Sequence, residues 1–449
     1  MVDHPLYKTA PADVHKVLGR WILTDGFSFV YDAEHSHDAF IVDAVNGDEY
    51  LDLFSFFASM PIGHNHPGLH DHDFLARLQR VAVVKPSNSD LYTPAMADFV
   101  ATMGRIVPEP YKHMFFIEGG ALAVENALKV AFDWKVRKNM EKGLIPREGD
   151  QQLGTQVIHF RTAFHGRSGY TLSLTNGFSI EKTYYYPKFP WPRVSTPALR
   201  FPLDEHNLAS TIASETLSIS EIRKAFADNP NQIAAIIVET IQGEGGDNHF
   251  RPEFLRALRQ LCDEQEAMLI FDEIQCGMGM TGKWWAFEHY DVRPDIFSFG
   301  KKAQVCGIAS TARADEVASC FTVPSRINST WGGNLVDMVR CTRYIEIIEQ
   351  ESLLQNANAV GGYLLERLLE LQDGYRMVSN VRGRGLMCAF DLPNTAQRAR
   401  ALQLLAEAKV LLLPAGAQSI RFRPALDLKR EHVDLAIQRI KTVLDKLLF

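Results

Sequence analysis

The sequence predicts an α/β protein in which a mostly parallel sheet is covered by helices on both faces and a smaller α+β domain packs on it. Three observations lead to this fold class. Short apolar runs between residues 110 and 335 end in Gly, Asp or Glu. Stretches with helical spacing of apolar residues separate some of these runs, and this alternation is typical of parallel sheets. The C-terminal region has a different pattern, with short strands followed by one amphipathic helix.

The strands predicted for the large domain are MFFIEGG (114–120), QVIHF (156–160), AAIIVET (234–240), AMLIFDE (267–273) and DIFSFGKK (295–302). Two predicted helices follow Gly120 and Pro252, with apolar faces formed by Val124, Leu128 and Ala131 and by Leu255, Leu258 and Cys262. In parallel sheets, ligands bind beyond the carboxyl ends of the strands. Gly119-Gly120, Glu239, Asp272 and Lys301 are expected at that edge.

The C-terminal segment VLLLPAGAQSIRFRPAL (410–426) predicts two short strands around a turn. The last helix follows, with one apolar face formed by Val433, Ile437, Ile440, Leu444 and Leu447. We therefore expect residues 1–75 to contribute to a small domain, 76–338 to form the large domain, and 339–449 to form the C-terminal small domain.

Composition excludes several classes of protein. The 449 residues carry a formal charge of −7, so a basic surface for nucleic acid or for an anionic membrane is not expected. No run approaches the roughly 20 apolar residues that span a bilayer, and no secretory signal is visible. The six cysteines are scattered without a C-x-x-C motif, which indicates a reduced, cytoplasmic protein.

Three features together indicate chemistry with pyridoxal 5′-phosphate (PLP). Asp272 ends a strand, where it could pair with a cationic ring nitrogen or cap a helix. Lys301 follows a strand and a glycine, where it could form a Schiff base or belong to a solvated lysine pair. Gly119-Gly120 could cradle a phosphate at a helix N-terminus or simply form a tight turn. An acid, a lysine and a phosphate cradle are what a protein contributes to PLP.

Other motifs suggest alternatives. GMGMTGKW (277–284) fits a nucleotide phosphate loop, but Trp284 stands where Ser or Thr should bind Mg²⁺, and the loop follows the acidic strand too closely. His64, His66, His70 and His72 invite a metal site, yet GHNHPG is typical of a turn, so no metal is expected. Arg167 and Arg421 could each clamp a carboxylate or form an ordinary salt bridge.

The chain resembles the class III PLP-dependent aminotransferases along most of its length. The motifs that carry the resemblance are EGGALAVENALK (118–129), FHGRSGYTLSLTN (164–176), ETIQGEGGD (239–247), FDEIQCGMGMTG (271–282), FGKKAQVCG (299–307), NSTWGGN (328–334) and RFRPAL (421–426). Many members have Pro where this chain has Thr240, and Arg where it has Met280. The resemblance implies the type I fold of PLP-dependent transferases, with a seven-stranded sheet in the large domain.

The resemblance also assigns roles at the cofactor. Lys301 would form the Schiff base with PLP and shuttle protons, and Asp272 would hold the ring nitrogen protonated. The other cofactor contacts that it implies are Gly120, Ala121, Phe164, His165 and Gln275. Thr330 would come from the neighbouring subunit to complete the phosphate site, which implies a homodimer.

Within the family, KPSNSD (85–90), FDWK (132–135), FGKKAQVCG and RINSTWGGN (326–334) resemble members that use L-lysine. The implied reaction moves the ε-amino group to 2-oxoglutarate, giving glutamate and 2-aminoadipate 6-semialdehyde, which cyclises. Glu244 would pair with Arg421 when the amine binds and release it for 2-oxoglutarate. Arg167 would grip the far carboxylate, and Asn328 would contact substrate. Ornithine, 4-aminobutyrate or a diamine are alternative donors, and a PLP-fold protein that only binds or regulates is a further alternative.

Overall fold

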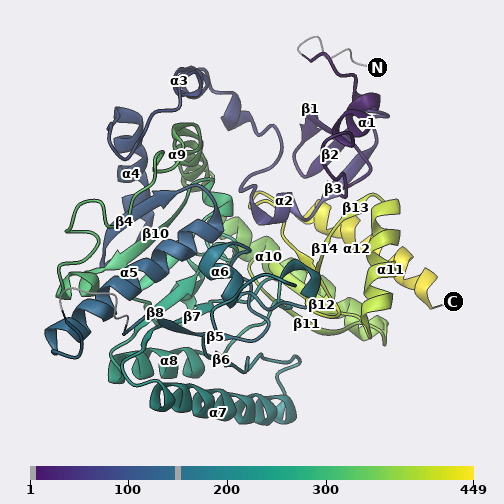
Figure 1. Ribbon diagram of the computed structural model, residues 1–449. Coiled ribbons are helices and arrows are strands. Elements are labelled where there is room, and N and C mark those ends of the chain that lie inside the picture. Colours follow the sequence, from purple (N-terminus) through teal and green to yellow (C-terminus); the bar gives the residue numbers. More distant parts are fainter. Residues whose placement is uncertain (1–6, 147–152, 449) are drawn as a thin grey trace.

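The computed structural model describes residues 7–146 and 153–448. Its central element is a seven-stranded sheet with the order β4-β10-β9-β8-β7-β5-β6 (Figure 1). The strands are β4 Tyr111–Ile117, β5 Gln156–Phe160, β6 Arg193–Val194, β7 Ile233–Glu239, β8 Met268–Asp272, β9 Ile296–Phe299 and β10 Cys306–Thr311. Only β10 is antiparallel to its neighbours, so the predicted mostly parallel sheet is confirmed. The sequence reading missed β10 and the short β6.

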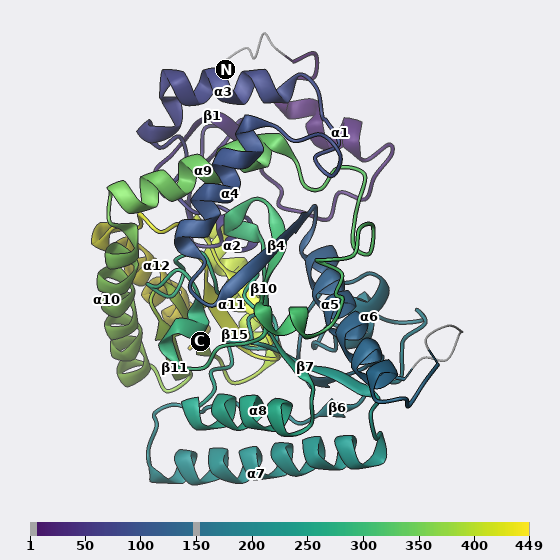
Figure 2. The same ribbon diagram turned by 90° about the vertical axis from the view of Figure 1, so that its left-hand side faces the viewer.

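Alternate residues of the central strands bury opposite faces of this sheet. Ile270 and Ile296 pack against the helix α5 (Gly120–Glu141), whereas Phe271 and Phe297 pack on the side of α8 (Pro252–Glu264). Figures 1 and 2 show α7 lying along the outer side of α8. The remaining helices of the large domain are α3 His72–Ala82, α4 Pro94–Ile106, α6 Gly169–Leu174, α7 Glu205–Asp228 and α9 Leu335–Gln350. This two-sided burial explains why the strands are nearly continuous apolar runs.

The N-terminal and C-terminal segments form two smaller sheets and meet in the first of them. One has the order β1-β2-β3-β13 and the other β11-β12-β15-β14. Their strands are β1 Tyr31–His37, β2 Phe40–Asp43, β3 Glu49–Asp52, β11 Ser379–Arg384, β12 Met387–Asp391, β13 Val410–Leu411, β14 Leu413–Ala415 and β15 Ser419–Phe422. Segment 410–426 therefore contains three strands, and the prediction of two was wrong. β13 pairs with β3, a partner far away in sequence, before the chain crosses to the other sheet.

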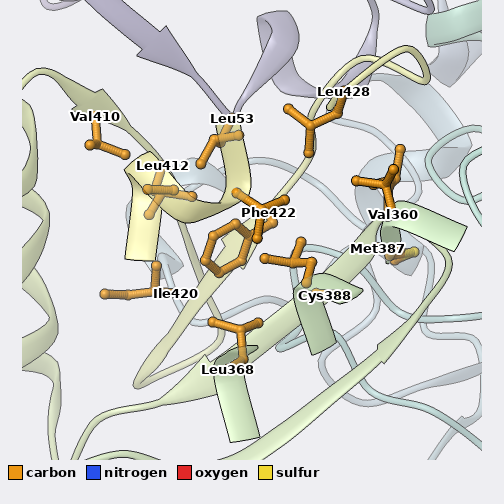
Figure 3. Packing of buried hydrophobic residues seen from close by; sticks show 14 of the residues in the cluster. Leu53, Val360, Leu368, Met387, Cys388, Val410, Leu412, Ile420, Phe422 and Leu428 are labelled. Carbon is orange, nitrogen blue, oxygen red and sulfur yellow. The ribbon is translucent and has the colours of Figure 1, made fainter. Parts of the chain in front are cut away.

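One hydrophobic core joins these sheets to the C-terminal helices. Leu53 follows β3, Val360 lies on a helix, and Phe422 ends β15, yet all three belong to the same buried cluster (Figure 3). The helices outside the large sheet are α1 Val14–Leu18, α10 Leu353–Gly374, α11 Thr395–Glu407 and α12 Arg430–Leu447. None of the described helices combines the length and apolar character that a bilayer crossing needs. The domain boundaries at 75 and 338 stay predictions.

The short element α2 (Ser55–Ala58) has an uncommon backbone. All four of its residues are in the left-handed region, with φ of 38° at Ser55, 52° at Phe56, 60° at Phe57 and 67° at Ala58. None is glycine, and the left-handed conformation costs an L-residue about 1–2 kcal/mol. Contacts from the rest of the fold must therefore hold this turn in place.

A buried ion pair connects the loop after β7 to the segment after β15. Arg423 donates to both carboxylate oxygens of Asp247, and both side chains are almost fully buried. We expect Asp247→Ala to lower the free energy of unfolding by about 3–5 kcal/mol, because it leaves a buried guanidinium without its counter-charge. Urea unfolding followed by circular dichroism measures this. Asp228→Ala, in an exposed pair with Lys224, is the control and should cost about 1 kcal/mol or less; equal losses would contradict the argument.

Candidate active site

Strand register brings polar side chains together at one edge of the central sheet. Glu239 ends β7 opposite Asp272 of β8, and Asp272 is opposite Ser298 of β9. Because the three strands are parallel and in step, all three side chains belong to the same edge. Lys301 comes two residues after the end of β9, so it starts from this edge as well.

The Asp272 carboxylate is buried and held by three donors. The His165 ring contacts Oδ2 through Nδ1 at 2.8 Å, and the Ser298 hydroxyl donates to Oδ1 at 2.9 Å. The backbone N–H of Ile274 also donates to Oδ1, at 3.1 Å. These contacts fix both carboxylate oxygens, which suits a group that must hold a positively charged partner in one orientation.

The two adjacent lysines occupy different environments. Lys301 lines the cavity described below, whereas Lys302 is buried and donates from Nζ to the carbonyl oxygen of Ala58 at 3.1 Å. Burial, assisted by the positive charge of Arg421, lowers the pKa of Lys301 to about 8. Burial and Arg423 lower the pKa of Lys302 to about 7. Both lysines have a lowered pKa, so the pKa values do not distinguish them. Lys301 is the one that lines the cavity, and this favours Lys301 as the nucleophile.

The N-terminus of α5 opens on the same cavity. Gly119 precedes the helix with φ of 100°, a conformation that favours glycine, and no side chain caps the helix there. Helix α5 is 22 residues long, and its first backbone N–H groups carry partial positive charge. An uncapped helix end of this kind is suited to a phosphate.

These elements enclose a cavity of about 530 Å³. It is lined by Ser59, Gly119, Gly120, Ala121, Phe164, His165, Gly166, Glu239, Asp272, Ile274, Gln275, Lys301, Gln304 and Cys306. Every cofactor contact expected from the sequence belongs to this lining except Thr330. Glu239 accepts from the backbone N–H groups of Phe164 and Gly243, at 3.0 and 2.9 Å, and burial raises its pKa to about 7. Its carboxyl group thereby fixes the backbone at Phe164.

Two buried arginines of the β15 segment reach the cavity wall. Arg421 and Arg423 both donate to Oε1 of Gln275, at 2.7 and 3.0 Å. Burial, together with the neighbouring charge of Arg423, lowers the pKa of Arg421 to about 10. With Oε1 engaged, the amide nitrogen of Gln275 is the group that can donate to an oxygen of a ligand.

The expected Glu244–Arg421 ion pair is replaced in this structure. Glu244 accepts from Lys182 Nζ at 2.8 Å, and its second oxygen, Oε2, is buried without a hydrogen bond among the described residues. Lys182 ends a short 3-10 helix (Ile180–Lys182) that has no strong sequence signal, which is why the local motif did not reveal this pairing. Arg167 is exposed and borders a separate hollow that it shares with Lys182.

The loop that carries Asn328 and Thr330 is exposed and braced by an earlier segment. The Ser89 hydroxyl donates to the Ser329 carbonyl at 2.5 Å, and Asn88 N–H donates to the Trp331 carbonyl at 3.1 Å. Both residues belong to KPSNSD (85–90). The exposed position of Thr330 is compatible with a role in another subunit's site.

Sequence reasoning missed several residues of the site. Ser298 could have been found, because it precedes Lys301 on a strand in register with Asp272. Ser59 and Gln304 had no comparable signal, since their place in the cavity depends on contacts between distant segments. The alternative motifs have other contacts: His64 binds Asp52 at 3.0 Å, and Lys283 of the glycine loop donates to the Glu288 carbonyl at 2.8 Å.

Comparisons with known proteins agree with this geometry. Residues 25–444 match the family model described as aminotransferase class-III. An L-lysine-epsilon aminotransferase of Mycobacterium bovis is 52% identical over 97% of this chain and 96% of its own length. The structure of lysine aminotransferase from M. tuberculosis in the internal aldimine form has a TM-score of 0.94 and 51% identity, covering 98% of this chain and 100% of that one. Mouse mitochondrial 4-aminobutyrate aminotransferase is 32% identical over 98% of this chain and 91% of its own length.

The lowered pKa of Lys301 gives a testable pH dependence. A lysine attacks a carbonyl only in its neutral form, so the rate of Schiff-base formation between the apoprotein and PLP should rise through pH about 8. An ordinary lysine would give a rise near pH 10.4. Stopped-flow absorbance across pH 6–11 measures this rate, with Lys301→Ala as the control. A midpoint near 10, or an unchanged rate in the variant, would contradict the assignment.

Proposed function

This chain belongs to the class-III aminotransferases, and from that premise we propose that it transfers the ε-amino group of L-lysine to 2-oxoglutarate. The products are glutamate and 2-aminoadipate 6-semialdehyde, which cyclises. The observation that carries the choice of donor is the 52% identity, over nearly the whole chain, to an L-lysine-epsilon aminotransferase. The 4-aminobutyrate enzyme of the mouse is much less similar, at 32%. Ornithine, 4-aminobutyrate and diamines remain the alternative donors to be tested.

The described residues fit PLP, the cofactor of this family. The uncapped N-terminus of α5 at Gly120 and Ala121 is suited to the phosphate, and Asp272 is suited to the ring nitrogen. Lys301 lines the same cavity and supplies the amine that the aldehyde requires. When bound, PLP provides an electron sink for the charge left on a substrate carbon after a proton departs.

Lys301 is the proposed nucleophile and proton carrier. Its pKa of about 8 leaves a useful fraction of neutral amine near neutral pH, so the same group can accept a proton and return it. Asp272 cannot turn away, because His165 and Ser298 hold both of its oxygens. Phe164 forms part of the wall and is held through its backbone by Glu239. Asp272 and Phe164 are therefore held in fixed positions during both half-reactions.

The charge of the site supports the second substrate. Arg421 and Arg423 are buried and near enough for their charges to act on Lys301, and Asp247 neutralises Arg423. Arg421 keeps a guanidinium nitrogen, Nε, without a hydrogen bond among the described residues. A buried arginine with a free donor is suited to a carboxylate, because a bidentate contact replaces the hydrogen bonds to water that the guanidinium has lost. We assign the carboxylate beside the reacting carbon of 2-oxoglutarate to Arg421.

L-Lysine has no carboxylate beside its reacting carbon, so Arg421 needs another negatively charged partner during the first half-reaction. We propose that Glu244 supplies it by exchanging Lys182 for Arg421. Glu244 is suited to this move, since one of its oxygens is already without a partner in the described structure and its charge is near enough to act on Arg421. Arg167 would grip the far carboxylate, and Asn328 would contact the substrate.

The proposed enzyme is a homodimer in which Thr330 of each subunit completes the phosphate site of the other. Asn328 and Thr330 are exposed on a loop braced by Asn88 and Ser89, which supports this arrangement. The six described cysteines are free and buried, which supports a reducing compartment, and we propose the cytoplasm.

A panel of amine donors tests the proposed substrate. With 2-oxoglutarate as acceptor, L-lysine should give the largest kcat/KM, at least about tenfold above ornithine and 4-aminobutyrate. Ornithine is one methylene shorter, a difference worth about that much, and 4-aminobutyrate is shorter still and lacks the α-amino group. Glutamate and the cyclic imine are the readouts. A clear preference for ornithine or 4-aminobutyrate would reassign the donor while leaving the family unchanged.

Replacing Glu244 tests the proposed exchange of partners. Glu244→Ala should slow the half-reaction with L-lysine by about tenfold or more, because Arg421 would then face the amine donor without a counter-charge. The half-reaction with glutamate should change much less. Single-turnover absorbance measures each half separately. Equal losses in both halves would show that Glu244 only supports the fold.

A further inference from the structure

The left-handed turn α2 and the residue after it are bound to the segment that carries the proposed nucleophile. Lys302 donates to the carbonyl oxygen of Ala58 at 3.1 Å, and Gln304 donates to that of Ser59 at 2.6 Å. We propose that Lys302 and Gln304 are positioning residues that hold turn 55–59 as a wall of the active-site cavity. The inference deepens the proposed function, since it identifies residues that set the fit of the amine donor beside Lys301.

The contacts match the geometry of the two segments. Successive carbonyl groups, at 58 and 59, receive donors from residues 302 and 304, the first within a short helical turn (Lys301–Ala303) and the second directly after it. Gln304 also donates to the carbonyl of Lys301 at 3.1 Å, so one amide joins the turn directly to the nucleophile's own backbone. Ser59 and Gln304 both line the cavity. A shift of the turn would therefore change the cavity itself.

The turn needs such support because its backbone is strained. Four consecutive residues without a glycine adopt positive φ, and strain of this kind persists only where neighbouring contacts enforce it. The first half is held by Asp52, whose Oδ1 accepts from the N–H groups of Phe54 and Ser55, at 3.0 and 2.7 Å. The second half, at Ala58 and Ser59, is held by Lys302 and Gln304.

A further tether joins the turn to the arginine segment. The Ser55 hydroxyl donates to the carbonyl of Arg423, and Arg423 N–H donates to the Leu53 carbonyl at 2.7 Å. The turn is thus bound at one end to the strand that presents Arg421 and at the other to the segment that presents Lys301. Its position therefore bears on the spacing between Lys301 and Arg421, the two groups that we place at the reacting end of the substrates.

The identity of Lys302 supports a specific role. Its side chain is almost fully buried, and placing a polar amine there carries a desolvation cost that an apolar side chain of the same length would avoid. Packing alone would be satisfied by methionine. The amine therefore has a use as a hydrogen-bond donor, and its contact with the Ala58 carbonyl is the one that the structure provides.

The test compares Lys302→Met and Gln304→Leu with Lys224→Met, an exposed control on α7, using the full-length enzyme loaded with PLP. Hydrogen–deuterium exchange of the peptide over residues 54–60 should accelerate about tenfold in both site variants and stay unchanged in the control. The KM for L-lysine should rise about tenfold while kcat changes less than about twofold. A general loss of structure would instead lower the apparent kcat, because a smaller fraction of the enzyme would be active.

Unchanged exchange and unchanged KM in both variants would overturn the proposal. If Lys302→Met does not fold, Gln304→Leu decides by the same two measurements. The exchange result does not depend on the identity of the amine donor. Wild-type protein that turns over no lysine would therefore reject the proposed substrate, while the protection of residues 54–60 would still decide the role of Lys302 and Gln304.

Discussion

The in-step parallel pairing of β7, β8 and β9 is the constraint on which the site depends. It aligns Glu239, Asp272 and Ser298 at one edge of the sheet and starts the Lys301 segment beside them. Burial of both sheet faces makes this register hard to change, because a slip of one residue would exchange the α5 face for the α8 face. Core packing therefore fixes the position of Asp272 and of the segment that carries Lys301, and the rigid sheet keeps the two in place.

Positive charge is the second organising feature. Lys302, Arg421 and Arg423 are buried and Lys301 lines the cavity, so the charged forms of these groups are unfavourable unless anions are bound nearby. Asp247 and Asp272 offset part of this positive charge within the chain. A phosphate at the N-terminus of α5 and a dicarboxylate at Arg421 would neutralise the remaining positive charge. Burial is the main cause of the lowered pKa of Lys301, and Arg421 and Arg423 lower it further, so the arginines that suit a carboxylate substrate also help to keep the amine neutral.

Much of the fold and the main site residues could be predicted from the sequence because their signals are local. Each of these signals can be recognised within a few adjacent residues: an apolar run that ends in Asp272, a glycine pair before α5, and a lysine after β9. The pairing of β13 with β3 could not be predicted, because the partners are far apart in sequence and both are short. The same holds for Lys182 at Glu244 and for the left-handed turn at Ser55–Ala58, which is stable only through tertiary contacts. Motifs predicted candidate site residues, and the fold was needed to show which of them are in contact.

The central claim is that one lysine of the adjacent pair, Lys301, bonds to the cofactor opposite Asp272. Borohydride reduction of the PLP-loaded enzyme followed by peptide mass spectrometry tests it most directly, since reduction makes the linkage permanent and fragment ions separate the two lysines. We predict that the phosphopyridoxyl mass is found on Lys301 alone. The same mass on Lys302, or no stable linkage to either lysine, would contradict the account.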